Sequence, residues 1–162
     1  MLKINRQTDY AVRVVLALAV DQTEKRMASA VIQQKMLIPQ SYMARIVAQL
    51  ANCGIIRTFA GRDGGLRLSR PAEQVTLRDV VEVFEGPVLL SECLKVKGED
   101  DCPFQSNCPV RPKWGRVQMA ILRELEAVTF HDLARDVIHD SFQNVIVNVF
   151  GITESALPAN SI

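Results

Sequence analysis

Apolar residues in the first third of the chain recur at spacings of three and four, which is typical of helices with one buried face. This spacing predicts a first helix over residues 8–20 and two shorter helices over residues 28–36 and 39–52. Pro39 fits the first turn of the later helix, where its missing N–H costs nothing. Two short helices with a tight connection predict a helix-turn-helix, and Gly54 is placed to end its second helix.

The next segment predicts a hairpin followed by a helix. Residues 55–59 and 66–69 have the composition of short strands, and the glycine-rich stretch 60–65 between them predicts a turn. A hairpin directly after a helix-turn-helix is a candidate wing. Thr76 and Asp79 then predict a capping box for a helix that ends at Gly86.

From residue 87 to residue 112 no period survives, which predicts a long irregular segment. Beyond it a long amphipathic helix is predicted from an apolar stripe formed by Trp114, Val117, Ile121, Leu125 and Val128. The stripe belongs to the core or forms a seam with a partner helix, and we favour a dimer seam. Thr129 with Asp132 predicts the start of a further short helix. The remaining tail carries one apolar run, residues 145–150, without a clear pattern.

Composition and charge narrow the class of protein. Of 162 residues 48% are hydrophobic and 23% charged, which is typical of a folded protein and not of a disordered one. Residues 1–80 carry twelve Lys and Arg against six Asp and Glu, a net +6, whereas residues 81–162 carry seven against twelve, a net −5. The basic half favours a polyanion such as DNA as a partner, and an accidental asymmetry of a solvated surface is the alternative.

The cysteines are the candidate chemistry. The apolar run 14–20 is too short to span a bilayer, so we expect a cytoplasmic protein with no membrane association, in which clustered cysteines indicate a metal or redox site. Cys93, Cys102 and Cys108 are spaced C-x8-C-x5-C, which differs from the close pairs of zinc sites and suits an iron–sulfur cluster. Zinc and three reduced cysteines are the alternatives. Cys53 is interpreted as a small buried apolar residue beside Leu50.

Four motifs and the three cysteines follow one another in a distinctive order. The motifs are Thr8-Asp9-Tyr10-Ala11, Ile38-Pro39-Gln40-Ser41-Tyr42, Gly64-Gly65-Leu66-Arg67-Leu68-Ser69-Arg70-Pro71 and Thr76-Leu77-Arg78-Asp79-Val80-Val81-Glu82. With these motifs the chain resembles the Rrf2 family of winged-helix transcription regulators over residues 1 to about 137. The resemblance implies a homodimer that binds partly palindromic operator DNA.

The resemblance also implies a 2Fe-2S or, as we favour, a 4Fe-4S cluster held by Cys93, Cys102 and Cys108 of one subunit. The cluster-assembly branch of the family has a His three residues after its last Cys, where Arg111 stands here, and arginine cannot ligate iron. The nitric-oxide-sensing branch instead takes an Asp from the first helix of the partner subunit. Asp9 occupies that place and is the expected fourth ligand, and capping of the first helix is its alternative role.

Six residues are expected to contact DNA. The exposed start of the recognition helix and the wing present them to base edges and phosphates: Gln40, Ser41, Tyr42, Arg45, Arg57 and Arg62. Ala44 and Ala60 replace residues that the cluster-assembly branch uses to contact bases. The operator of that branch is therefore not assumed for this chain.

These observations predict a mainly α-helical fold with a small β-hairpin wing. We expect a winged helix-turn-helix DNA-binding domain (1–86), a cysteine cluster-binding loop (87–112), a dimerisation helix with a following short helix (113–137) and a C-terminal tail (138–162). The expected function is a non-enzymatic transcriptional regulator, a repressor as the resemblance implies, whose cluster senses nitric oxide, iron or redox state. A cluster-free thiol-based regulator is the alternative, and an iron–sulfur redox protein, which would show no salt-dependent affinity for DNA, is a weaker one.

Overall fold

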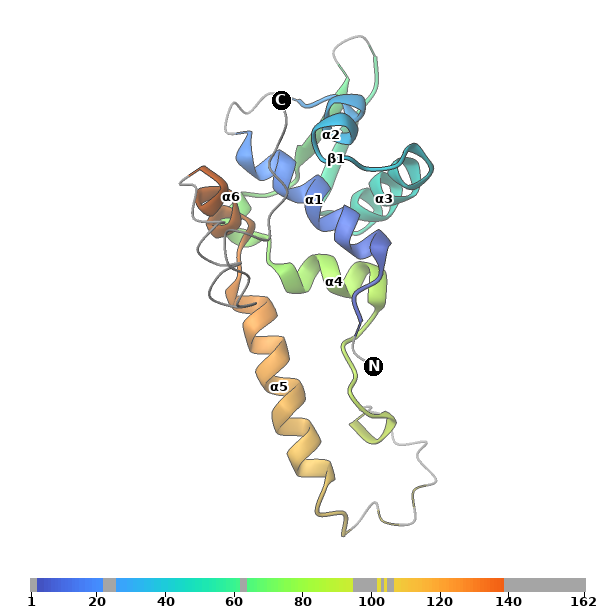
Figure 1. Cartoon of the computed structure of the whole chain (residues 1–162), viewed down its shortest axis with the longest axis vertical. Coiled ribbons are helices and arrows are strands. Elements are labelled where there is room, and N and C mark those ends of the chain that lie inside the picture. Colours follow the sequence, from blue (N-terminus) through green and yellow to red (C-terminus); the bar gives the residue numbers. More distant parts are fainter. Residues whose placement is uncertain are drawn as a thin grey trace, which may run out of the picture.

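A computed structural model of the chain describes residues 3–21, 26–61, 64–94, 102, 104 and 107–138. The elements in chain order are α1 (Arg6–Val20), α2 (Ser29–Lys35), α3 (Gln40–Asn52), β1 (Ile56–Phe59), β2 (Gly65–Leu68), η1 (Ala72–Gln74), α4 (Leu77–Glu85), η2 (Glu92–Leu94), α5 (Arg111–Ala127) and α6 (Phe130–Ile138). Figure 1 shows α1–α4 and the hairpin gathered in one body, from which α5 extends as a rod. This mainly helical fold with one antiparallel hairpin confirms the predicted fold class.

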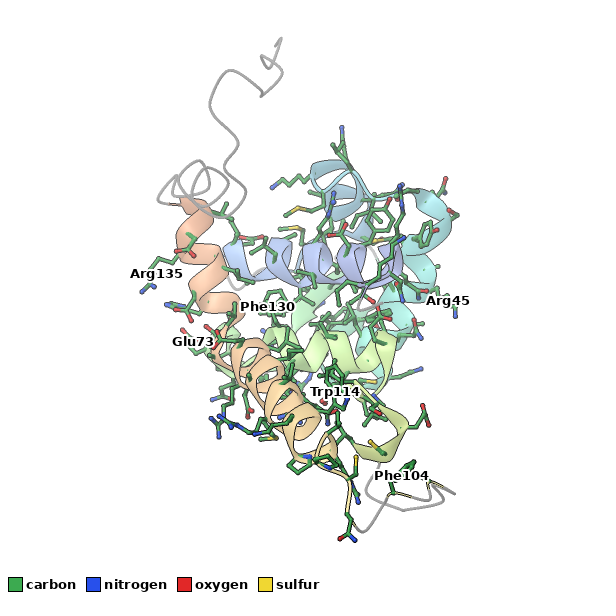
Figure 2. All side chains as sticks on the ribbon, turned by 60° about the horizontal axis from the view of Figure 1, so that its bottom comes forward. Arg45, Glu73, Phe104, Trp114, Phe130 and Arg135 are labelled. Atoms are coloured by element: carbon green, nitrogen blue, oxygen red, sulfur yellow. The ribbon has the colours of Figure 1, made fainter. Side chains whose placement is uncertain are left out.

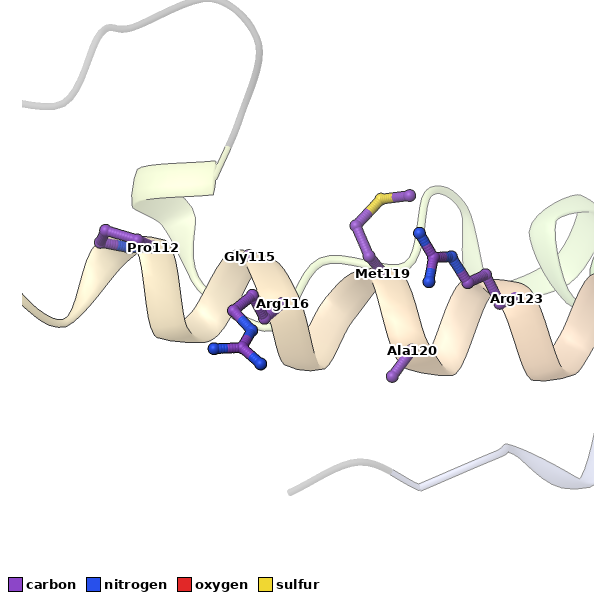
Figure 3. Close-up of a pocket in the computed structure, with 6 residues that line it drawn as sticks. All are labelled: Pro112, Gly115, Arg116, Met119, Ala120 and Arg123. Carbon is purple, nitrogen blue, oxygen red and sulfur yellow. The ribbon is translucent and has the colours of Figure 1, made fainter.

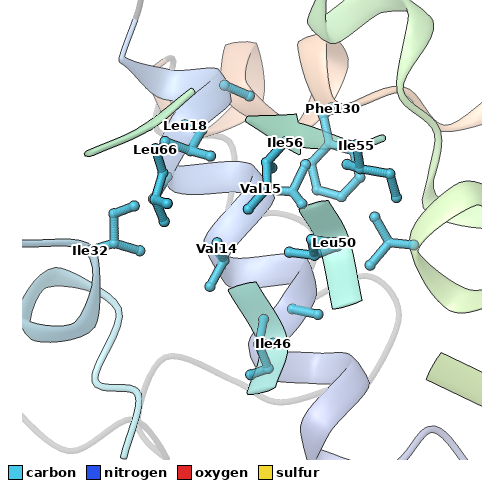
Figure 4. Packing of buried hydrophobic residues seen from close by; sticks show 14 of the residues in the cluster. Val14, Val15, Leu18, Ile32, Ile46, Leu50, Ile55, Ile56, Leu66 and Phe130 are labelled. Atoms are coloured by element: carbon cyan, nitrogen blue, oxygen red, sulfur yellow. The ribbon is translucent and has the colours of Figure 1, made fainter. Parts of the chain in front are cut away.

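Helix α1 lies at the centre of the hydrophobic core (Figure 4). Val14 and Val15 of α1 are completely buried, as are Ile46 and Leu50 of α3. Phe130, the first residue of α6, is also completely buried, so α6 returns to the body after α5 and packs on α1. Full burial of such side chains stabilises a fold by about 1.5–3 kcal/mol each.

The predicted helix-turn-helix is present as α2 and α3. Helix α3 begins at Gln40, and Pro39 is its N-cap residue with an extended backbone. The prediction that Pro39 lies in the first helical turn is therefore wrong by one residue. Gly54 follows the helix with a φ of +71°, which confirms its role in ending α3. Leu37 in the connecting turn has a φ of +52° and is 81% exposed, an uncommon conformation for a residue with a branched side chain.

The wing is a two-stranded antiparallel hairpin in which Ile56 pairs with Leu68 and Phe59 with Gly65. A third short segment joins it, because Met27 and Leu66 exchange backbone hydrogen bonds of 3.0 and 2.8 Å. A Cβ atom on Gly65 would lie 2.8 Å from the carbonyl oxygen of Met27. Glycine is therefore required where this segment meets the hairpin.

The predicted capping box of α4 is confirmed. The backbone N–H of Asp79 donates to Oγ1 of Thr76 at 3.2 Å, and the N–H of Thr76 donates to Oδ2 of Asp79 at 2.9 Å. Thr129 caps α6 in a similar way, since the N–H of Asp132 donates to its hydroxyl at 3.1 Å. The start of α6 is also attached to the entry of α4, through a hydrogen bond of 2.9 Å from the N–H of Phe130 to the carbonyl of Val75.

Helix α5 differs from the other long helices because it buries none of its residues within one chain. Trp114 and Val117 are each 46% exposed, and Met119 is 49% exposed. Ile121 and Leu125 are half-buried. The predicted apolar stripe is thus present, and in a single chain it stands outside the core. Within the described residues no helix combines the length and apolar character needed to cross a bilayer.

Candidate functional site

The start of α3 presents polar side chains to solvent. Gln40, Ser41 and Arg45 are exposed, and Arg45 extends away from the helical body (Figure 2). Tyr42 is half-buried, and its ring meets that of Tyr10 edge to face with centroids 5.1 Å apart. Tyr42 therefore packs the start of α3 against α1, and it lies next to the exposed polar residues at that start.

A shallow groove lies between α3 and the strands of the hairpin, and residues of α2 also line it. Its volume is about 390 Å³, and its lining combines the amide of Gln40 with apolar side chains that include Val47 and Phe59. Arg57 is exposed on β1 beyond this groove. Arg62, the remaining expected DNA contact, lies outside the described residues. The described part of the wing and the start of α3 therefore flank one groove.

Asp9 lies in the first turn of α1 and is exposed. Its alternative role as a cap is excluded, because Asn5 is the N-cap and its side chain accepts a hydrogen bond of 2.9 Å from the N–H of Thr8. The Asp9 carboxylate pairs with Nη2 of Arg13 at 2.7 Å. Arg13 also donates to the carbonyl of Met36 at 3.5 Å, next to the turn between α2 and α3. Asp9 is thus accessible and is linked to the helix-turn-helix through a single side chain.

A second polar junction joins the start of α1 to the end of α4. Thr8 is completely buried, and its hydroxyl donates to Oε1 of Glu85 at 2.5 Å, an atom that also accepts the N–H of Asn5 at 2.9 Å. The hydrogen bond from Thr8, and next that from Asn5, hold the pKa of Glu85 below its ordinary value of 4.5. This junction was not predicted from the sequence, because no local pattern relates residues that are 77 positions apart.

Two of the expected cluster ligands lie around the start of α5. Cys93 is in η2, with its Sγ 3.2 Å from Oγ of Ser91. The Sγ of Cys108 accepts the backbone N–H of Arg111 at 3.4 Å. Cys108 and Leu94, the neighbour of Cys93, line the same hollow of about 500 Å³. N–H donors to sulfur are among the contacts by which proteins tune iron–sulfur clusters.

Cys102 is exposed, and residues 95–101, 103 and 105–106 around it lie outside the description. All four cysteines are free thiols. Among the described residues, no group of three or more His, Cys, Asp or Glu side chains is arranged to hold a metal ion. Of the three cysteines, Cys108 therefore lines the hollow, Cys93 lies next to a residue that lines it, and Cys102 lies between them in the sequence.

The prediction for Cys53 is wrong. It is exposed and forms the C-cap of α3 instead of extending the buried face that ends at Leu50. The helical period placed it near that face, but the helix ends one residue earlier, at Asn52. Cys53 thus provides an accessible thiol at the end of α3, whereas the three clustered cysteines lie in the 87–112 segment.

Comparison with known proteins extends these observations. A family model described as "Rrf2: Iron-dependent Transcriptional regulator" matches residues 4–136. Protein aau3 of Rhizobium meliloti is 32% identical over 134 residues, which is 83% of this chain and 86% of that protein. The HTH-type transcriptional regulator NsrR of Geobacillus kaustophilus is 30% identical over 135 residues, 83% of this chain and 91% of its own.

Solved structures agree with the fold. The structure of CymR, the global cysteine regulator of B. subtilis, superposes with a TM-score of 0.66 at 27% identity, covering 83% of this chain and 98% of that one. IscR of T. potens superposes with a TM-score of 0.65 at 20% identity, and the match covers 84% of this chain and 88% of the IscR chain. At this identity the similarity supports only the fold. The predicted resemblance is thereby confirmed.

Proposed function

The chain belongs to the Rrf2 family of transcriptional regulators, which are not enzymes, and on this premise we propose that it is a homodimeric repressor acting on operator DNA in the cytoplasm under the control of an iron–sulfur cluster. The observation that carries the proposal is the family match over residues 4–136, which includes both the helix-turn-helix and the three clustered cysteines.

The DNA-binding unit is residues 1–86, with α3 as the recognition helix. Gln40, Ser41 and Arg45 are exposed at its start, where recognition helices contact base edges in the major groove. Tyr42 holds that start on α1. Arg57 and Arg62 on the wing bind the phosphate backbone or the minor groove beside it.

The dimer forms through α5, the dimerisation helix of the 113–137 unit, whose second, short helix is α6. Trp114 and Val117 leave an apolar face on α5 for a second copy of the chain. Beside it lies a hollow of about 610 Å³ where Gly115 and Ala120 allow a close approach (Figure 3). Two-fold symmetry would place the recognition helices about one DNA turn, roughly 34 Å, apart.

The residues present fit a cluster site. Cys93, Cys102 and Cys108 on the 87–112 segment provide the three thiolates, and Asp9 of the partner provides an oxygen donor, which its exposed position on α1 allows. A cluster bound there, 4Fe-4S or alternatively 2Fe-2S, would supply iron that reacts with nitric oxide or responds to iron supply and redox state. An oxygen donor binds iron less firmly than thiolate, so the iron that Asp9 would hold would be the more labile position.

The residues of this chain provide a link from that site to the DNA. Asp9 holds Arg13 at 2.7 Å, and Arg13 reaches the carbonyl of Met36 and lies 5.5 Å from the ring centre of Tyr10. Recruitment of the Asp9 carboxylate by the partner subunit competes with its ion pair to Arg13. A coupling of about 1–3 kcal/mol between the two arrangements would give 5- to 150-fold regulation of DNA binding.

The first test is anaerobic purification followed by an absorption spectrum and iron and sulfide analysis. We expect a brown protein whose thiolate-to-iron absorption is lost in Cys102→Ser and retained in Cys53→Ser, a matched control because both thiols are exposed and free. Asp9→Ala should keep iron but change the spectrum and the sensitivity to nitric oxide. An unchanged spectrum and sensitivity would remove Asp9 from the ligands.

A cluster-free thiol regulator is the second candidate, and the exposed, free thiol of Cys102 favours it. A colourless protein that cannot be reconstituted with iron and sulfide, but loses DNA affinity on mild oxidation, would establish this candidate. Cys102→Ser would then be insensitive to the oxidant, whereas Cys53→Ser would respond as the natural protein does.

A further inference from the structure

Two arginines lie directly opposite each other on the outer face of the wing. Arg57 of β1 pairs in register with Arg67 of β2, and both are exposed. The neighbouring positions Ile56 and Leu66 point the other way and are buried, with 2% and 4% exposure. Alternation along the strands therefore places both guanidinium groups on the solvent side of the hairpin.

Neither arginine has a carboxylate partner among the described residues. Arg13, Arg70 and Arg78 each pair with an acidic side chain at 2.7–2.9 Å, but no such contact is found for Arg57 or Arg67 in the described part of the chain. Like charges directly opposite each other destabilise an antiparallel pair. The outer face of the wing therefore carries a repulsive pair of charges at positions where most other residue types would give a more stable hairpin.

A third cation is held beside this pair. The Arg26 guanidinium lies 3.9 Å from the centre of the Phe59 ring, a cation–π contact. Phe59 is two residues beyond Arg57 and so occupies the same face of β1. Its partner across the hairpin is Gly65, where a Cβ atom would lie 3.1 Å from Cβ of Arg26. The missing side chain of Gly65 makes room for Arg26 next to Phe59.

We propose that Arg57, Arg67 and Arg26 form a phosphate clamp that grips the DNA backbone beside the operator half-site. Guanidinium groups bind phosphate oxygens through two parallel hydrogen bonds, and anion binding removes the repulsion between Arg57 and Arg67. The clamp provides affinity that is independent of DNA sequence, whereas α3 provides the reading of bases. The inference rests on the proposed DNA-binding function and adds Arg67 and Arg26 to its contacts.

The test compares Arg67→Gln with Arg135→Gln in the full-length dimer. Both changes remove one exposed arginine, but Arg135 lies on α6, away from the wing. Binding to a duplex of random sequence is measured by fluorescence anisotropy between about 50 and 200 mM salt. We expect Arg67→Gln to weaken binding about tenfold and to make the slope of log K against log salt shallower by about 0.9 per subunit. Arg135→Gln should change neither quantity.

The free protein provides a second readout that a general loss of folding would not give. At low salt Arg67→Gln should raise Tm by about 1–3 °C because the cross-strand repulsion is gone. The gain should disappear at high salt, where exposed charges are screened. A variant that combines Arg57→Gln with Arg67→Gln should gain little more, since one substitution already removes the repulsion.

The outcomes separate the clamp from the proposed function. Natural protein that binds no duplex at any salt concentration would overturn both. Natural protein that binds DNA, beside an Arg67→Gln variant with the same affinity and salt slope, would overturn the clamp alone. Stabilisation of the natural protein by inorganic phosphate at constant ionic strength, lost in Arg67→Gln while DNA affinity is unchanged, would make the pair a site for free anions and overturn its assignment to DNA.

Discussion

Replacing Glu85 by Gln tests the junction between α1 and α4. The Glu85 carboxylate accepts the Thr8 hydroxyl at 2.5 Å and the Asn5 N–H at 2.9 Å. Hydrogen bonds to a charged group contribute about 1.5–3 kcal/mol when buried, and solvent reduces this for an exposed side chain such as Glu85. The amide keeps an acceptor but loses the charge, so we expect the free energy of unfolding to fall by about 1 kcal/mol at neutral pH.

The effect should depend on pH in a defined direction. The folded-state pKa of Glu85 lies below its ordinary value of 4.5, first because of the Thr8 hydroxyl. A carboxyl group with a lowered pKa stabilises the fold above its unfolded-state pKa, and this contribution is lost as the pH falls through the folded-state value. The stability difference between natural protein and Glu85→Gln should therefore be complete at neutral pH and shrink below pH 4.5.

Urea unfolding followed by circular dichroism at several pH values measures this difference, with Asp136→Asn on the exposed face of α6 as the control. Asp132, whose pKa is lowered mainly by the Thr129 hydroxyl, titrates in all the proteins and cancels in the comparison. A difference of the same size at neutral and at acid pH would refute the electrostatic reasoning. Equal stability of Glu85→Gln and natural protein at neutral pH would show that the junction contributes nothing.

Three further changes test the fold by the same measurement. Leu37→Gly should raise the free energy of unfolding by about 0.5–1 kcal/mol, because it relieves a φ of +52° at an exposed side chain. Phe130→Ala should lower it by about 3–5 kcal/mol, because it empties a completely buried site between α6 and the core. Thr76→Ala should lower it by about 1 kcal/mol through loss of the α4 cap, and Thr76→Ser should restore most of that loss.

Local signals in the sequence were sufficient for most of the elements. The apolar period of α1, the Thr76–Asp79 capping box and the end of α3 at Gly54 depend on residues close together in the chain, and each was predicted correctly. Contacts between distant residues were not predicted. The burial of Phe130 against α1 and the hydrogen bond between Thr8 and Glu85 arise only once α6 and α4 have packed on α1.

The candidate site was predicted to a smaller extent. Spacing identified Cys93 and Cys108, and the structure places them around the start of α5, but spacing does not determine which residues surround a thiol. Cys53 shows this limit, because a shift of one residue at the end of α3 exposes a side chain that the helical period had buried. Arg57 and Arg67 lie opposite each other only because of the register of the hairpin, and the glycine-rich turn did not allow that register to be predicted from the sequence.

The properties of α5 connect the cysteine segment with the proposed dimerisation. An isolated helix of 17 residues is only marginally stable in water, and α5 buries no residue within one chain. Its polar contacts with other described parts of the chain include an ion pair of 3.1 Å between Arg78 and Glu126 and a hydrogen bond of 3.2 Å from the N–H of Leu90 to the side chain of Gln118. The first of these is an exposed ion pair, a kind that contributes little. In the proposed dimer, a second copy of the chain would add to the stability that α5 gains from α4 and η2. Cys108 lies three residues before the start of α5, so on the proposed function cluster binding and ordering of the dimer seam would act on the same end of one helix.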